Sequence, residues 1–61
     1  MNVMPWTDQC VLSEIEENGP IGKDDIKKGV AITDMELAAS IKRLTDQRFI
    51  DQPVKDRFMA I

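Results

Sequence analysis

The sequence contains no histidine and only one cysteine, Cys10, among its 61 residues. A single cysteine cannot form an internal disulfide, and without histidine the chain has no cluster of zinc ligands. A cysteine nucleophile would also need a neighbouring base. We therefore expect Cys10 to be a small buried residue of a helix, and we expect the protein to hold no metal and no other cofactor.

Motifs that mark enzyme active sites are also missing. The sequence has no glycine-rich phosphate loop and no paired-acid motif. A chain of this length forms one domain that buries only about 60% of its unfolded surface, which leaves little room for an enclosed pocket. We therefore predict a single domain over residues 1–61 that is not an enzyme.

Long apolar runs and export signals are absent as well. No run approaches the roughly 18 apolar residues that a membrane helix needs. Residues 1–5 lack the basic and apolar regions of a secretory signal. With 43% hydrophobic and 31% charged residues, the composition is that of an ordinary globular chain. We expect a cytoplasmic protein with no membrane partner.

Charge is distributed unevenly along the chain, whose net charge is −3. Residues 1–22 carry four acids and no base, whereas residues 23–61 carry eight bases and seven acids. The acidic total argues against a strong non-specific grip on nucleic acid, because such a grip comes from neutralising phosphates. Only a local basic surface after residue 22 could supply one.

The first of three predicted helices covers about residues 7–18. Thr7 is a candidate N-cap, and Trp6 before it is placed to staple onto Val11. Glycine readily takes the left-handed cap conformation and proline cannot continue a helix, so Gly19-Pro20 should end this one. The apolar stripe Val11, Leu12 and Ile15 should face the core.

A short extended piece around Ile21 should lead into a second helix over about residues 23–28. Its acids lie at the positive N-terminal end and its lysines at the negative C-terminal end, an order that stabilises a helix. Ile26 is its core anchor, and Gly29 ends it.

The third helix is predicted over about residues 34–47. Thr33 and Glu36 fit a capping box, and Ile32 is placed to staple onto Leu37. Leu37, Ile41 and Leu44 follow at spacings of four and three and should form the buried face. The exposed face should carry Met35, Glu36, Ala39, Ser40, Lys42, Arg43 and Asp46.

Residues 49–61 should form a β-hairpin. Apolar residues at Phe49-Ile50 and around Phe58 indicate two short strands, joined by a turn near Lys55-Asp56. Proline has no backbone N–H for a sheet, so Pro53 should lie at an edge or a bulge.

This order of elements resembles the winged-helix variant of the helix-turn-helix. Residues 11–50 are similar to the family pattern of a first helix ending in Asn-Gly-Pro, a short second helix, an Ile-Thr turn and a helix ending in Lys-Arg-Leu. Ile32-Thr33 resembles the turn before the recognition helix, and Phe49-Ile50 the strand leading into the wing. The resemblance implies a mainly α fold with a small β-hairpin, a three-helix winged helix-turn-helix.

The family resemblance implies sequence-specific binding of double-stranded DNA by a small transcriptional regulator. The third helix would enter the major groove, and the wing would reach a neighbouring phosphate or the minor groove. Lys42 takes a phosphate-facing position, and Lys55 and Arg57 take the wing positions. The groove-facing candidates are Asp34, Met35, Glu36, Ala38, Ala39, Ser40 and Arg43.

The sequence departs from the family at several of these positions. Glu36, Ala38 and Ala39 stand where DNA readers commonly hold Ser, Thr, Arg, Gln or Asn. An acid can accept a hydrogen bond from cytosine and alanine can contact a thymine methyl, but neither binds phosphate. Arg48 stands where a glycine usually precedes the strand.

These departures leave two other interpretations open. The domain could instead serve protein contact, with Met35, Ala38 and Ala39 forming a homodimer or partner patch. Alternatively, the bases form a solvated face and the acids of the third helix only complement its dipole.

Overall fold

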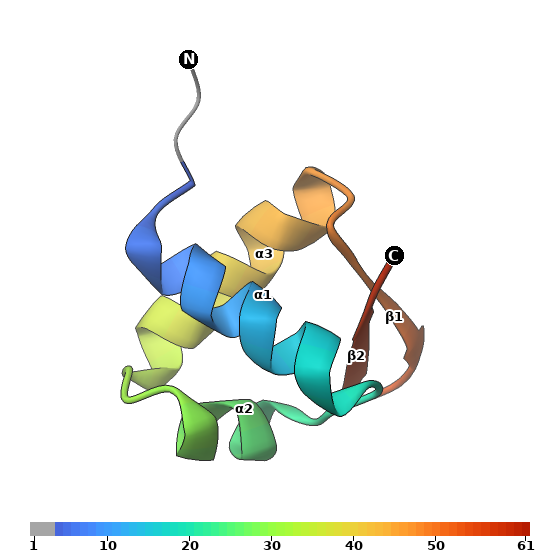
Figure 1. The fold of residues 1–61 in the computed structure, drawn as a ribbon, viewed down its shortest axis with the longest axis horizontal. Coiled ribbons are helices and arrows are strands. Elements are labelled where there is room, and N and C mark those ends of the chain that lie inside the picture. The colour runs from blue at the N-terminus through green and yellow to red at the C-terminus, as the bar shows by residue number, and fades with distance from the viewer. Residues whose placement is uncertain (1–3) are drawn as a thin grey trace.

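The computed structural model describes residues 4–61. Residues 1–3, which form part of the segment expected to lack an export signal, lie outside the described residues. The chain folds into helices α1 (Trp6–Asn18), α2 (Lys23–Gly29) and α3 (Asp34–Asp46), followed by strands β1 (Ile50–Val54) and β2 (Arg57–Ala60) (Figure 1). The predicted class is confirmed: three helices and an antiparallel hairpin, in the layout of a helix-turn-helix with a wing. Within residues 4–61, no helix is long and apolar enough to cross a membrane.

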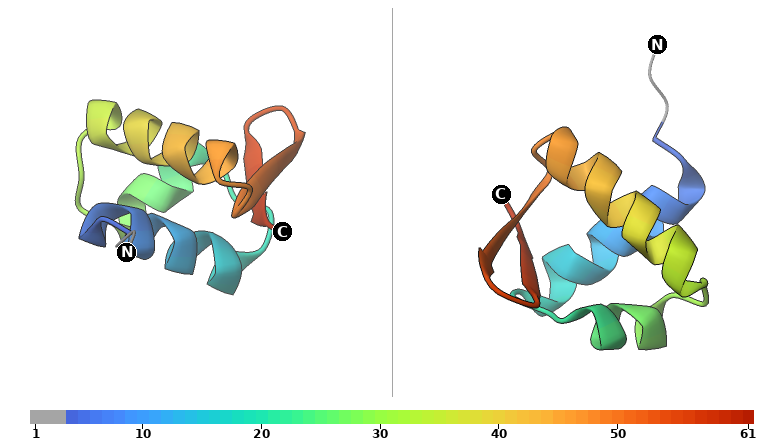
Figure 2. Two further views of the ribbon diagram at one scale, coloured as in Figure 1. Left: turned by 90° about the horizontal axis from the view of Figure 1, so that it is seen from above. Right: turned by 180° about the vertical axis from the view of Figure 1, so that it is seen from behind.

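The three helices form two layers, with the hairpin at one end (Figure 2). α1 crosses in front of α3, and α2 lies below both of them (Figure 1). Every helix and strand contributes at least one side chain to the core. The core residues are Val11, Ile15, Ile21, Ile26, Leu37, Ile41, Leu44, Ile50 and Phe58. The predicted buried face of α3 is therefore confirmed.

The start of α3 follows from its capping box. The backbone N–H of Glu36 donates to Thr33 Oγ1 at 3.1 Å, and the backbone N–H of Thr33 donates to Glu36 Oε1 at 3.1 Å. Two amide donors that the helix cannot satisfy by itself thus find partners. Ile32, just before the cap, packs partly buried against the core cluster that contains Leu37.

The start of α1 differs from the prediction. The helix begins at Trp6, Pro5 takes the N-cap position, and no side chain caps it, so the assignment of Thr7 as N-cap is wrong. The staple onto Val11 is wrong too, because the Trp6 side chain is 74% exposed while Val11 is fully buried. Trp6 lies inside the first turn of α1 instead of before it.

The hairpin is joined to the helices by a third extended segment at Ile21. Ile21 and Phe58 exchange two backbone hydrogen bonds, of 2.9 and 2.8 Å, which confirms the extended segment predicted at Ile21. β1 and β2 pair antiparallel, and their register shifts between Asp51 and Val54, where Pro53 lies. The expected irregularity at Pro53 is thus present, and the bulge keeps its missing N–H out of the ladder.

The connection from α3 to β1 contains a strained residue. Arg48 has φ 63°, in the left-handed region that glycine tolerates and most L-residues avoid. It is the residue that the sequence resemblance marks as standing where a glycine is usual.

We expect Arg48→Gly to stabilise the protein. Left-handed backbone costs an L-residue about 1 to 2 kcal/mol, and the extra flexibility of glycine in the unfolded chain offsets about 0.5 to 1 kcal/mol of that. A net gain of about 0.5 to 1 kcal/mol should appear as a higher urea midpoint at unchanged slope. Arg48→Ala, which loses the same charge but keeps the strain, should show no such gain; equal gains in both variants would contradict a backbone origin.

Candidate functional site

The predicted recognition surface lies on α3, outside the buried face that Leu37, Ile41 and Leu44 form. Met35 is 82% exposed, and Glu36, Ala38 and Lys42 are also exposed. Ala39 is half-buried. Most of the predicted outer face of α3 is therefore available to a partner.

Two of the predicted site residues, Ser40 and Arg43, form hydrogen bonds within the protein. Ser40 is fully buried, so its placement on the exposed face is wrong. Its hydroxyl donates to Asp8 Oδ1 at 2.6 Å. Arg43 binds the same carboxylate with two donors, Nε to Oδ2 at 2.9 Å and Nη2 to Oδ1 at 2.8 Å. This cluster joins the first turn of α1 to the middle of α3.

The interactions of the Asp8 cluster are strong because Arg43 binds the Asp8 carboxylate with two donors and the carboxylate is shielded from solvent. The Asp8 side chain is only 2% exposed, whereas that of Arg43 is 44% exposed. The Arg43 guanidinium holds the pKa of Asp8 below its usual value of 3.8, against the opposing effect of burial, and the Ser40 hydroxyl assists. In turn, the carboxylate raises the pKa of Arg43. Asp8 therefore remains ionised, and it holds Arg43 along the surface of α3.

The helical spacing contains a signal for this cluster. Asp8 precedes Val11 by three positions and Ile15 by seven, which places it on the apolar stripe of α1. Ser40 lies three positions after Leu37 and four before Leu44, so it shares their buried face. A polar residue on an apolar stripe needs a buried partner. The spacing could have shown that Asp8 and Ser40 need partners, but not that they bind each other.

The wing bases lie where the prediction placed them. Lys55 belongs to the turn between β1 and β2, and Arg57 begins β2; both are exposed. Arg57 also faces α2, where it lines a shallow hollow of about 580 Å³ together with Lys23 and Lys28. The hollow contains acids as well, Asp24, Asp25 and Asp56. Its charge is therefore mixed.

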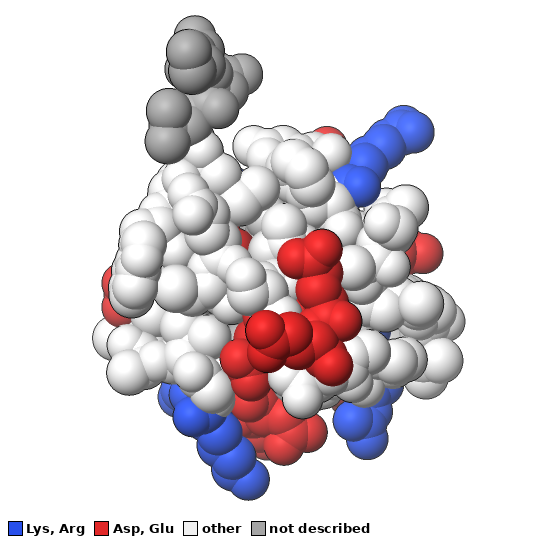
Figure 3. All heavy atoms as spheres, viewed as in Figure 1, with Lys and Arg blue, Asp and Glu red and all other residues white. Residues whose placement is uncertain are grey.

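Basic residues are confined to one part of the fold. Within residues 4–61, every lysine and arginine lies on α2, on α3, in the connection after α3 or on the hairpin, and α1 carries acids alone. On the α1 face, acidic side chains gather near the middle and basic ones lie at the margins (Figure 3). α1 therefore carries four acids and no base, whereas the rest of the described chain carries eight bases and seven acids.

The order of the elements, the capping box of α3 and the attachment of the hairpin through Ile21 give a layout consistent with a helix-turn-helix plus wing. These features determine a fold and are compatible with several functions. No protein-family model matches the chain, and no curated protein or solved structure matches it.

Proposed function

We propose that this protein is a winged-helix domain that binds double-stranded DNA through α3 and the wing. The observation that supports the proposal is the distribution of the basic residues: every lysine and arginine of the described residues lies on α2, on α3, in the connection after α3 or on the hairpin. A helix beside a wing that carries exposed Lys55 and Arg57 can enter a major groove while those side chains contact phosphates.

The proposed contact set is smaller than the sequence alone implies. Lys42, Lys55 and Arg57 are exposed and contact phosphates. Met35, Glu36, Ala38 and Ala39 face the base pairs of the DNA. Ser40 and Arg43 are held by Asp8, so they position α3 instead of reading DNA.

Affinity should be modest, because acids remain on the same surface. Asp34 and Glu36 both lie in the first turn of α3. The charge of Asp34 is partly offset by Lys27, whose Nζ lies 2.6 Å from Asp34 Oδ1. Glu36 is exposed and opposes phosphate, although its carboxylate also completes the capping box.

A salt titration with double-stranded DNA fragments tests the proposal. We expect binding at low salt whose log-log salt slope falls by about one unit in Lys42→Ala and by about one unit in Lys55→Ala. Glu16→Gln, on α1, removes a charge far from the proposed surface and should leave the slope unchanged. Wild-type protein that ignores all DNA at low salt would contradict the proposal.

A second candidate function is protein contact through the same face of α3. Its support is Met35, which is 82% exposed beside the small side chains Ala38 and Ala39. Small residues allow another helix to approach closely, and methionine adapts its shape to a partner. Under this alternative, Ala38→Glu should dissociate a homodimer in sedimentation, and DNA binding should be undetectable.

A further inference from the structure

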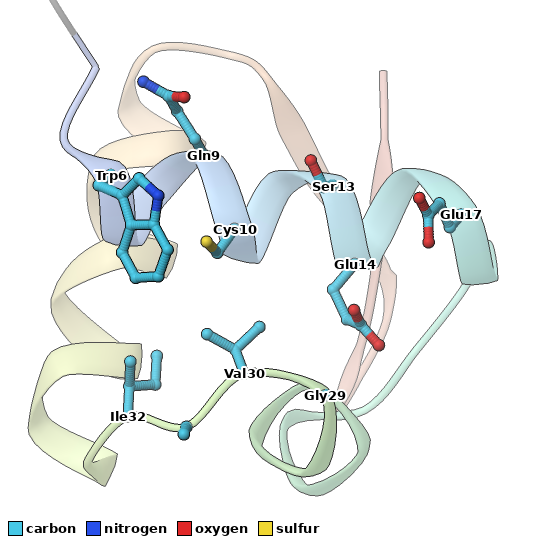
Figure 4. Close-up of a pocket in the computed structure, with 10 residues that line it drawn as sticks. Trp6, Gln9, Cys10, Ser13, Glu14, Glu17, Gly29, Val30 and Ile32 are labelled. Atoms are coloured by element: carbon cyan, nitrogen blue, oxygen red, sulfur yellow. The ribbon is translucent and has the colours of Figure 1, made fainter.

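A groove runs between α1 and the connection that joins α2 to α3 (Figure 4). Its volume is about 460 Å³, enough to receive one or two large side chains. We name it the α1 groove. It is lined by Trp6, Gln9, Cys10, Ser13, Glu14, Glu17, Gly29, Val30, Ala31 and Ile32. It lies on the α1 face, so it is separate from the surface proposed for DNA.

One end of the α1 groove is apolar. Trp6 and Cys10 from α1 approach Val30 and Ile32 from the connection (Figure 4). The Trp6 ring is 74% exposed, and no staple holds it against the core. An exposed tryptophan beside an apolar hollow is the kind of residue that contributes most to binding when a partner covers it.

The other end of the α1 groove is acidic. Glu14 and Glu17 lie there, one turn of α1 apart (Figure 4). Among residues 4–61, neither glutamate takes part in an ion pair. The Glu14 carboxylate lies directly over Gly29, where a β-carbon would overlap it. Asn18 Nδ2 also donates to Glu14 Oε1 at 3.3 Å, so that carboxylate is held in place.

The C-terminal part of α1 offers these acids no compensating charge of its own. The last turn of α1 contains no basic residue, and acids near a helix C-terminus oppose its dipole. A cation from outside the domain would offset this repulsion.

We propose that the α1 groove docks a segment of a partner protein in which a large apolar side chain is followed by lysine or arginine. The apolar side chain enters between Trp6 and Ile32, and the cation reaches Glu14 and Glu17. Charge complementarity selects this occupant, because α1 presents acids alone. A second copy of this chain, with its net charge of −3, is opposed by repulsion.

Selection from a displayed library of random 12-residue peptides, with the full chain as bait, identifies the probe. We expect enriched peptides that combine an aromatic or large aliphatic residue with nearby lysine or arginine. Trp6 is the only tryptophan, so its fluorescence reports binding of each synthetic peptide directly. The same peptides with lysine and arginine replaced by glutamine are the peptide-side control.

Substitutions in the α1 groove test whether its charges and Trp6 bind the peptides. We expect Glu14→Gln/Glu17→Gln, which keeps the shape and removes both charges, to weaken binding by about tenfold, whereas Glu16→Gln, outside the groove, changes it less than about twofold. Trp6→Ala should abolish binding of the labelled peptide measured by anisotropy. The proposal is overturned if no peptide is enriched, if the double glutamine variant binds equally well, or if Trp6 instead mediates self-association in sedimentation. DNA binding is measured separately, so failure of one proposal does not affect the other.

Discussion

Replacing Leu44 with alanine should remove a large part of the protein's free energy of unfolding. Leu44 is fully buried on the face of α3 that meets the core. Truncating a buried leucine costs about 2 to 5 kcal/mol, through lost burial and the cavity that remains. The whole chain is expected to have a free energy of unfolding of only about 3 to 9 kcal/mol. The side chain of Leu44 alone therefore accounts for a large part of the free energy of unfolding.

Urea titration followed by circular dichroism measures this effect, and α3 offers a matched control. Met35 is another long apolar residue of the same helix, but it is 82% exposed. Met35→Ala should change the free energy of unfolding by less than about 0.5 kcal/mol. A Leu44→Ala variant as stable as Met35→Ala would show that the buried face of α3 has been assigned wrongly.

Local signals explain why the helices could be predicted. The capping box involves residues three positions apart, and the apolar stripe of α3 repeats every three or four residues. Such patterns can be read without knowing the fold. The helix bounds agree with the prediction within one residue for the same reason.

Contacts between distant parts of the chain could not be predicted in this way. Asp8 is 32 positions from Ser40 and 35 from Arg43. The residue type of Arg43 correctly suggests a cation on the surface of α3, but its availability depends on Asp8. The exposure of Trp6 was missed because the helix starts one residue earlier than predicted, after Pro5, which has no capping side chain. The α1 groove depends on how α1 packs beside the α2–α3 connection, which local patterns do not encode.

The Asp8 cluster should give the other large effect. Asp8→Asn keeps the size of the side chain but removes its charge. It also replaces one accepting oxygen by an NH2 group, which then faces a donor of Ser40 or Arg43. Hydrogen bonds to a charged group contribute about 1.5 to 3 kcal/mol, and we expect a loss of that order at neutral pH. Asp46→Asn, at an exposed aspartate of the same protein, should change stability by less than about 0.5 kcal/mol.

The pH dependence of this loss identifies its cause. Because the pKa of Asp8 is lower in the folded state than its usual value of 3.8, the unfolded state binds the proton more tightly. The stability that the carboxylate supplies is therefore fully present from neutral pH down to about pH 5, begins to fall as the pH approaches 3.8, and disappears as the pH falls through the lower, folded-state pKa. Every other ionisable group is shared by wild type and Asp8→Asn, so its contribution cancels when the two proteins are compared. The difference in unfolding free energy should be constant from neutral pH down to about pH 5 and should shrink on further acidification. A difference that stays the same in acid would mean that packing of the side chain, and not its charge, holds α1 to α3.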